Sequence, residues 1–308
     1  METISGIVVL NKEEGLTSQS AVSRVRRLFG ARKAGHSGTL DPMATGVLPV
    51  LLGGATVAAE YLVSGEKHYV ATLRLGLTSD TEDITGEILT RHEGALPTAE
   101  AVRLAAEGFL GESEQIPPMY SALKQGGRKL CDLARAGVTV EREARPITVH
   151  RLDVTPLSES DYRLDVICSK GTYIRTLCAD IGAALGVGGV MASLCRAEAG
   201  GFLLEAAHTL GELAAMSEAE LASVVIPVEN LFANAPEVIL PPFFARLARS
   251  GQQIYLKKIG QTYPLGAKIR LKDENGFFAL GEVREFPDEK GGGEMVLAIK
   301  PIKMFLAG

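Results

Sequence analysis

The sequence predicts an α+β protein in two parts, a larger body in which strands and helices intersperse and a small β-rich tail. Its 308 residues are about twice the length of a typical domain. The composition, 46% apolar and 22% charged without a low-complexity segment, is that of an ordinary globular protein. We therefore expect a first domain over residues 1–235 and a second over residues 236–308.

The N-terminal segment predicts a strand followed by a helix. Residues 7–10 are continuously apolar, as in a buried strand. Thr17 or Ser18 can cap the helix, and Gly30 is placed to end it. The apolar positions of this helix, at helical spacing, are Val22, Val25, Leu28 and Phe29.

The rest of the chain alternates between the two kinds of element. In the body, strands are expected over residues 69–75, 84–90, 147–154 and 162–168, and helices over 98–110 and 172–185. Capping-box patterns that begin at Thr209 and Ser217 mark two more helices. From about residue 246 the tail is strand-like, with strands over 267–271, 276–283 and 294–299 and a turn at 273–276.

Three features bear on the location of the protein and on metal binding. The longest apolar stretch, residues 46–59, is too short and too interrupted by Gly and Pro to span a membrane, so we expect buried core. The N-terminus lacks the basic start and long apolar run of a secretion signal, which makes the cytoplasm the expected location. The four cysteines form no C-x-x-C pair and no zinc-like spacing with His, so reduced thiols and no metal site are expected.

The distribution of charge matters more than its sum. A net charge of −5 argues against a nucleic-acid partner. However, residues 16–40 hold five basic residues and no acidic one, and residues 119–151 hold seven basic against three acidic. Residues 79–115 hold nine acidic against two basic. This segregation indicates a basic face on an acidic body, with merely uneven solvated charge as the alternative.

Asp41 stands in a segment, residues 35–46, that is neither periodic nor simply polar. Gly35, Gly38 and Gly46 surround it, so the backbone is expected to need conformations or close approaches that side chains forbid. Pro42 keeps Asp41 out of the helical region, which lets its carboxylate project from a loop. Taken alone, the Asp-Pro pair is a turn initiator or a helix cap.

The common cofactor motifs are missing from the sequence. It contains no phosphate-binding loop, dinucleotide fingerprint, zinc-binding triad or nucleophile elbow. Any reaction must therefore use ordinary side chains, and no cofactor is expected. A carboxylate nucleophile satisfies this condition, because aspartate can attack a carbon centre, form a covalent intermediate and then leave.

Four blocks of sequence stand out in order along the chain. The first is Gly35-His36-Ser37-Gly38-Thr39-Leu40-Asp41-Pro42, continued by residues 44–49. The others are residues 116–124 (IPPMYSALK), 142–147 (REARPI) and 168–176 (CSKGTYIRT). Together these blocks resemble the TruB family of pseudouridine synthases. The resemblance implies a catalytic domain on a mixed, mainly antiparallel sheet, with helices and loops around a central cleft, and a tail similar to a β-barrel-like, RNA-binding PUA domain.

The resemblance implies three catalytic residues. Asp41 falls where the family has its nucleophile. Tyr69 falls where a tyrosine stacks on the target base and is a candidate for moving a proton; otherwise it would be a core aromatic in a strand. Arg175 falls where an arginine pairs with the catalytic carboxylate; otherwise it would form a salt bridge on a helix surface.

Four further residues are implied to bind substrate besides Tyr69. Tyr173 and Leu194 fall at positions that line the uridine pocket, although Leu194 alone would be taken as core. His36 falls where the family inserts a histidine into the RNA loop; a lone loop histidine is more often a hydrogen-bonded turn residue. Lys12 falls where the family has a lysine, and both a phosphate contact and a structural contact are open.

The implied function is isomerisation of the uridine at position 55, in the T loop of tRNA, after that uridine is flipped out of the loop. We expect a monomer that needs no cofactor, no guide RNA and no membrane. Two positions depart from the family pattern: Glu13 replaces a proline, and Cys195 precedes Arg196 where two arginines are common. The alternatives are a non-catalytic tRNA-binding or folding protein, the catalytic subunit of a guide-RNA-directed pseudouridylation particle, and a small-molecule hydrolase with an Asp nucleophile.

Overall fold

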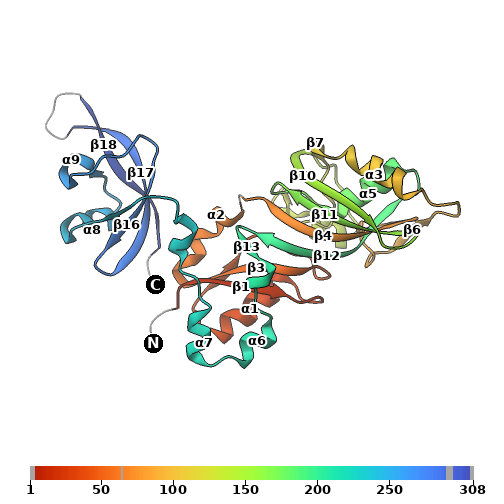
Figure 1. Cartoon of the computed structure of the whole chain (residues 1–308), viewed down its shortest axis with the longest axis horizontal. Coiled ribbons are helices and arrows are strands. Elements are labelled where there is room, and N and C mark those ends of the chain that lie inside the picture. Colours follow the sequence, from red (N-terminus) through yellow and green to blue (C-terminus); the bar gives the residue numbers. More distant parts are fainter. Residues whose placement is uncertain (1–3, 64, 289–293, 306–308) are drawn as a thin grey trace.

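A nine-stranded sheet forms the larger part of the protein, and a five-stranded sheet lies at one end of it (Figure 1). The computed structural model describes residues 4–63, 65–288 and 294–305. The large sheet has the order β1-β3-β12-β4-β11-β10-β7, with β2 beside β3 and β13 beside β12. Its strands are β1 (Gly6–Lys12), β2 (Ala34–His36), β3 (Thr45–Leu52), β4 (Lys67–Leu75), β7 (Gly111–Gln115), β10 (Arg145–Pro156), β11 (Asp161–Cys168), β12 (Gly189–Ala199) and β13 (Phe202–Leu203).

The mixed, mainly antiparallel sheet expected for the body is confirmed. Among the described strands of the large sheet, the pairing of β3 with β12 is parallel and the others are antiparallel. The predicted strands at 7–10, 69–75, 147–154 and 162–168 lie within β1, β4, β10 and β11. The first half of the apolar stretch 46–59 lies in β3, whose residues are almost all buried, as expected for core.

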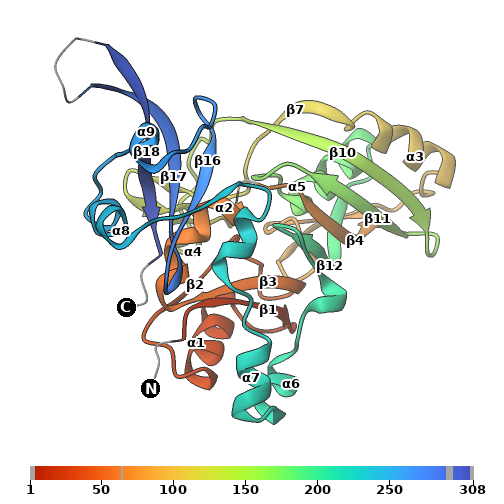
Figure 2. The ribbon, with the colours of Figure 1, turned by 60° about the vertical axis from the view of Figure 1, so that its left-hand side comes forward.

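Helices cover the large sheet and close its core. In the described chain α1 packs on β3 and on α6, α3 packs on β10, and α5 packs on β12 and β4 (Figures 1 and 2). None of the described helices is long and apolar enough to cross a membrane. The helices of the body are α1 (Ser18–Leu28), η1 (Gly53–Ala58), α2 (Ala59–Val63), α3 (Ala99–Glu107), α4 (Leu130–Arg135), α5 (Ile174–Ala184), η2 (Leu204–Ala206), α6 (Leu210–Ala215), α7 (Glu218–Ser223) and η3 (Val228–Phe232).

Several helix ends follow the predicted capping chemistry. Thr17 caps α1, since its side chain accepts from the Ser20 amide, and Gly30 follows the helix in a left-handed conformation. Both capping boxes, which begin at Thr209 and Ser217, are present at the starts of α6 and α7.

The predicted strand at residues 84–90 is wrong in its first half. β6 (Ile88–Arg91) pairs with β5 (Leu77–Ser79), but the residues before β6 form a turn. Asp83 causes this turn, because its Oδ1 accepts hydrogen bonds from the Thr85 amide at 2.9 Å and the Thr85 hydroxyl at 2.6 Å. The side chain of Asp83 therefore replaces a strand partner for this part of the backbone. A second short pair is β8 (Lys124–Gln125) with β9 (Arg128–Lys129).

The tail is a five-stranded sheet of order β14-β16-β17-β18-β15. The predicted tail strands and the turn at 273–276 are confirmed, but two helices were not predicted. Pro241 and Pro242 start the first helix, and its buried residues Ala245 and Ala248 face the sheet core. The elements are β14 (Glu237–Ile239), α8 (Pro242–Arg249), β15 (Ile254–Tyr255), α9 (Leu256–Ile259), β16 (Lys268–Asp273), β17 (Gly276–Pro287) and β18 (Met295–Met304).

An aromatic cluster joins the tail to the body. The ring of Phe232, in η3, packs on the rings of Tyr61, Phe277 and Phe305, with centroid distances of 5.0, 6.1 and 5.5 Å. The same apolar cluster includes Leu51 from β3. The tail is therefore attached through a packed interface as well as through the chain.

Candidate active site

The loop that carries Asp41 is held by hydrogen bonds at the residues on each side of Asp41. The Ser18 hydroxyl donates to the Leu40 carbonyl at 2.9 Å and accepts from the Leu40 amide at 2.8 Å. The Pro42 carbonyl accepts from the Gly15 amide at 2.8 Å and from Lys12 Nζ at 3.2 Å. Because the residues before and after Asp41 are fixed, its carboxylate projects from a rigid turn.

Two of the three glycines around Asp41 are needed for backbone reasons. Gly38 has φ of 75° and Gly46 has φ of 98°, which L side chains rarely adopt. A Cβ atom at Gly46 would also overlap the backbone of Arg196, where β3 and β12 run side by side. The expectation for Gly35 is wrong, because a Cβ atom there would meet nothing nearer than Thr56 at 4.0 Å and its φ is not positive.

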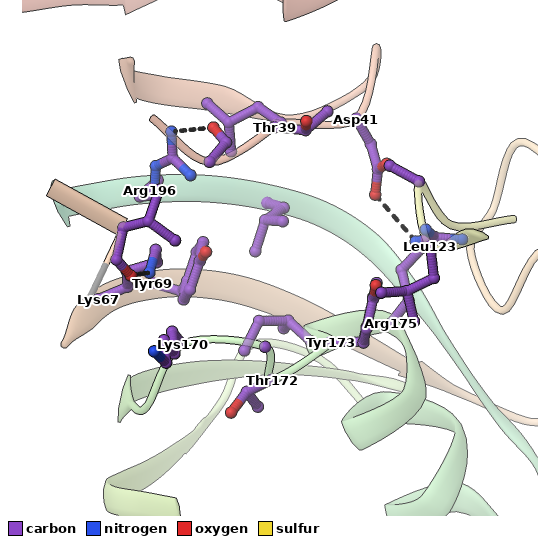
Figure 3. Close-up of a pocket in the computed structure, with 17 residues that line it drawn as sticks. Thr39, Asp41, Lys67, Tyr69, Leu123, Lys170, Thr172, Tyr173, Arg175 and Arg196 are labelled. Atoms are coloured by element: carbon purple, nitrogen blue, oxygen red, sulfur yellow. Dashed lines mark hydrogen bonds and ion pairs between the residues drawn. The ribbon is translucent and has the colours of Figure 1, made fainter. Parts of the chain in front are cut away.

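Arg175, in the first turn of α5, contacts the carboxylate of Asp41. Its Nε lies 2.9 Å from Asp41 Oδ2 (Figure 3). The side chain of Arg175 is 5% exposed, whereas that of Asp41 is 35% exposed. The arginine is therefore part of the protein interior and the carboxylate is accessible from the pocket.

The other donors of Arg175 bind two loops. Nη1 donates to the Thr81 carbonyl at 2.9 Å, and Nη2 donates to the Tyr120 carbonyl at 2.7 Å. Asp83, which is buried, places Oδ2 at 3.9 Å from Arg175 Nε and accepts from the Thr81 hydroxyl at 2.9 Å. The guanidinium thus connects the Asp41 loop to the turn at Asp83 and to the segment that contains Tyr120.

A pocket of about 420 Å³ opens beside this ion pair. Its volume lies in the range of small-ligand sites. Of the seven residues predicted for the site, five line the pocket: Asp41, Tyr69, Tyr173, Arg175 and Leu194. Figure 3 shows the Asp41 loop on one side of the pocket and the segment from Lys170 to Tyr173 on the other.

The wall at Tyr173 is fixed by a side chain that the sequence analysis did not single out. Gln115, at the end of β7, is buried and forms two hydrogen bonds with the backbone of Tyr173. Its Oε1 accepts from the Tyr173 amide at 2.8 Å, and its Nε2 donates to the Tyr173 carbonyl at 3.1 Å. Tyr173 also precedes α5 as its N-cap residue, so Gln115 helps to place Arg175 two residues later.

Lys12 and His36 lie outside the lining of the pocket. Lys12 has no exposed surface, and its ammonium donates to the carbonyls of Glu13, Leu16 and Pro42. These contacts are structural, and the contact of Lys12 with a phosphate stays a prediction. His36 ends β2, and its Nδ1 is buried without a partner among the described residues. Burial, and then the charge of Arg196, lowers the pKa of His36.

The sequence analysis assigned no role to two buried cations at the pocket. Lys67 and Arg196 line it, although both side chains are buried. Side chains two residues apart in a strand point to the same face of the sheet. Lys67 therefore shares a face with Tyr69 in β4, and Arg196 shares a face with Leu194 in β12. That spacing was the signal available in the sequence. Burial, followed by the charge of Arg196, lowers the pKa of Lys67.

The two pocket tyrosines are held as neutral phenols. Burial is the main cause that raises the pKa of Tyr69, and the nearby charge of Arg196 opposes it. Burial likewise raises the pKa of Tyr173, and the nearby charge of Arg175 opposes it. Within the described residues, no group of three or more His, Cys, Asp or Glu side chains is placed to hold a metal ion. The chemistry available at the pocket is that of a carboxylate, two phenols and buried cations.

Family comparisons agree with this site. The model described as "TruB family pseudouridylate synthase (N terminal domain)" matches residues 26–174, and "tRNA pseudouridylate synthase B C-terminal domain" matches residues 175–233. The chain is 41% identical over 283 residues to "tRNA pseudouridine synthase B" of Neisseria meningitidis serogroup A, covering 92% of this chain and 91% of that protein. It is 40% identical to the protein of the same name from Alkaliphilus oremlandii, covering 91% and 94%.

Solved structures give the same fold. The chain superimposes with a TM-score of 0.70 and 27% identity on a chain from "Crystal Structure of a Cbf5-Nop10-Gar1 Complex", covering 98% of this chain and 85% of that one. These matches place the protein among the pseudouridylate synthases. Within that class, the family models and the relatives at about 40% identity show that the chain belongs to the TruB family.

Proposed function

We propose that this chain isomerises uridine to pseudouridine at position 55 in the T loop of tRNA, with Asp41 as its nucleophile. The observation that carries the proposal is the accessible carboxylate of Asp41, paired with buried Arg175 beside a pocket walled by Tyr69 and Tyr173. A flipped-out uridine needs such a pocket, because the base must leave its stack before a side chain can reach it. Aromatic and apolar walls offset part of the cost of unstacking.

The reaction balances without any added group. The bond between N1 of the base and C1′ of the ribose breaks, and a bond between C5 and C1′ forms. C5 then loses a proton and N1 gains one, so that the product is an isomer of the substrate. Asp41 serves by forming a transient covalent bond while the base turns, and Arg175 fixes the direction of the carboxylate. Tyr69, with its ring at the pocket, is the candidate to stack on the base and to move a proton.

The names of the relatives and the charge of the surface support tRNA as the substrate. The relatives at about 40% identity are named tRNA pseudouridine synthase B, whereas the chain from the Cbf5-Nop10-Gar1 complex is 27% identical. This difference favours an enzyme that acts on tRNA over the subunit of a guide-RNA-directed particle. In α1 and the loop after it, the basic side chains available for phosphates are exposed, namely Arg24, Arg26, Arg27, Arg32 and Lys33.

We further propose that residues 1–235 form the catalytic domain and residues 236–308 a PUA-like RNA-binding domain. A separate apolar core beneath the strands of the tail supports this division. Residues 246–303 hold 11 basic against 7 acidic residues, in contrast to residues 198–245, which hold seven acidic residues and no basic one. A basic tail fixed to the body by the aromatic cluster at Phe232 offers a second contact for the RNA.

The test is incubation of the purified protein with an unmodified tRNA transcript, without guide RNA and with a metal chelator present. Pseudouridine is located by chemistry that marks it at single-nucleotide resolution. We expect modification at position 55 and none in a transcript in which this uridine is replaced by cytidine. Binding without modification would instead support the non-catalytic alternative, and modification only after a guide RNA is added would support the particle subunit.

A further inference from the structure

We propose that Arg196 is a positioning residue for the isomerisation, which acts through the hydroxyl of Tyr69 and does not touch the RNA. This inference rests on the proposed function. It assigns to the buried guanidinium the stabilisation of negative charge that forms on the Tyr69 oxygen during the reaction.

Arg196 lies where three strands of the large sheet meet. In the antiparallel pairing of β12 with β4, Arg196 is directly opposite Tyr69. In the parallel pairing of β12 with β3, it is opposite Gly46. Directly opposite residues point to the same face of a sheet, so the guanidinium and the phenol share the face that borders the pocket (Figure 3).

The guanidinium is anchored from the side of the Asp41 loop. Nε donates to the Val47 carbonyl at 2.8 Å, and Nη2 donates to the Gly38 carbonyl at 3.1 Å. Arg196 borders the pocket, but its 0% exposed surface leaves no atom of it open to a bound uridine in this structure. Any effect of Arg196 on the reaction therefore passes through a neighbouring pocket residue, and Tyr69 is the one that lies directly opposite Arg196 across β12 and β4.

The charge of Arg196 has no carboxylate partner. The ion pairs at this pocket within the described residues all involve Arg175, which takes the carboxylate of Asp41. A second buried cation, Lys67, donates to the backbone carbonyls of Val63 and Gly65. A buried cation without a counter-charge is costly to a fold, and an anion formed beside it offsets that cost.

The groups around the Tyr69 phenol shift its pKa in opposite directions. Burial raises the pKa of Tyr69 most; Arg196 on β12 lowers it, while Cys168 on β11 and Asp41 in its loop raise it. Lys67 is two residues away on the same strand. Arg196 is the buried cation that lies directly opposite Tyr69, and its charge favours the phenolate.

The chemical step that gains from this charge is removal of the proton from C5 of the base. The phenol of Tyr69 first loses its proton to water. Its oxygen then accepts the C5 proton, the electron pair of the C–H bond returns to the ring, and N1 takes a proton from water. The phenolate exists only within this sequence, and the fixed guanidinium stabilises it without any rearrangement.

The experiment compares the charge-removing variant Arg196→Met with the charge-keeping variant Arg196→Lys. Tyr69 is replaced by 3-fluorotyrosine, and its ionisation is followed by fluorine NMR without RNA, which makes the result independent of the true substrate. In Arg196→Met we expect the midpoint of the titration to rise by about one pH unit or more, which is on the order of a tenfold loss of phenolate at a given pH. In Arg196→Lys we expect a smaller rise. An unchanged midpoint in folded Arg196→Met would overturn the proposal.

A second readout uses the reaction itself. We expect the single-turnover rate of Arg196→Met on tRNA to fall ~10²-fold, with partial recovery in Arg196→Lys and at higher pH. A fall of equal size in both variants that pH does not change would show a purely structural role. If Arg196→Met does not fold, Arg196→Gln, which keeps a donor for Gly38, gives the same comparison with Arg196→Lys.

Discussion

Arg175 Nε lies 2.9 Å from Asp41 Oδ2, and the same guanidinium donates to the carbonyls of Thr81 and Tyr120. One buried side chain thus orients the proposed nucleophile and holds together three segments that are far apart in the sequence. The geometry uses the planar fork of arginine, because three acceptors in different directions are satisfied at once.

Arg175→Lys is expected to be nearly inactive although it keeps the charge. A lysine ammonium is a single point, so it does not reach Asp41 and both carbonyls together. We expect the single-turnover rate on tRNA to fall by ~10²-fold or more, and the free energy of unfolding to fall by about 1–3 kcal/mol because buried carbonyls lose their donors. Single-turnover kinetics and urea unfolding measure the two effects. Activity near that of the wild type would show that the fork geometry is not needed.

Asp83→Asn tests whether the turn beside Arg175 matters for the reaction. The amide keeps one oxygen for the Thr81 and Thr85 donors but removes the negative charge near Arg175. We expect the rate of the chemical step to fall by ~10-fold or more with little change in tRNA binding. The matched control is Asp153→Asn in β10, where the carboxylate pairs with Arg151 on the exposed surface. Equal rates in the two variants would refute a role for Asp83.

Lys12→Met is expected to affect stability and not RNA binding. The lost ammonium leaves the carbonyls of Glu13, Leu16 and Pro42 without their buried donor, which costs about 1–3 kcal/mol. Arg27→Met, on the exposed side of α1, should do the reverse and weaken tRNA binding at low salt. Thermal unfolding and tRNA binding distinguish the two variants. Weakened tRNA binding in Lys12→Met at unchanged stability would instead support a phosphate contact for Lys12.

Glu82 predicts a pH-dependent contribution to stability. Burial raises the pKa of its carboxyl above the ordinary 4.5, although Thr176 donates a hydrogen bond of 2.6 Å to it. The folded state therefore binds this proton more tightly, so stability falls as pH rises from 4.5 through the folded pKa. We expect Glu82→Gln, which has no such ionisation, to lose less stability than the wild type between about pH 4 and pH 7. Parallel pH curves for the two proteins in urea unfolding would contradict this.

Local patterns in the sequence predicted most of the fold. The alternation of β4, the helix capped by Thr17 and the capping boxes at Thr209 and Ser217 depend on neighbours along the chain, which a sequence displays. The short helix α8 was missed because it begins at Pro242, directly after Pro241, and because the chain from about residue 246 was expected to be strand-like. The strand expected at 84–90 failed because the side chain of Asp83 captures the Thr85 amide and hydroxyl.

The site was predictable only in part, for a related reason. The blocks around Asp41, Tyr173 and Arg175 identified residues that the fold brings to one pocket. Gln115 and Asp83 act through contacts with segments distant in the sequence, which no local pattern predicts. Arg196 was given no function because charged residues are expected at the surface, and only the fold shows that this one is fully buried.

The most direct test of the central claim is the single-turnover rate of pseudouridine formation in a tRNA transcript by Asp41→Asn. The amide has the size of the carboxylate, so the loop and the pocket should be preserved. It is not a nucleophile, so the covalent step should be lost. We expect formation of pseudouridine to fall by ~10³-fold or more while binding of the transcript stays within a few-fold of the wild type. Formation at the wild-type rate by Asp41→Asn would contradict the account, because the residue at the centre of the site would then not form the bond.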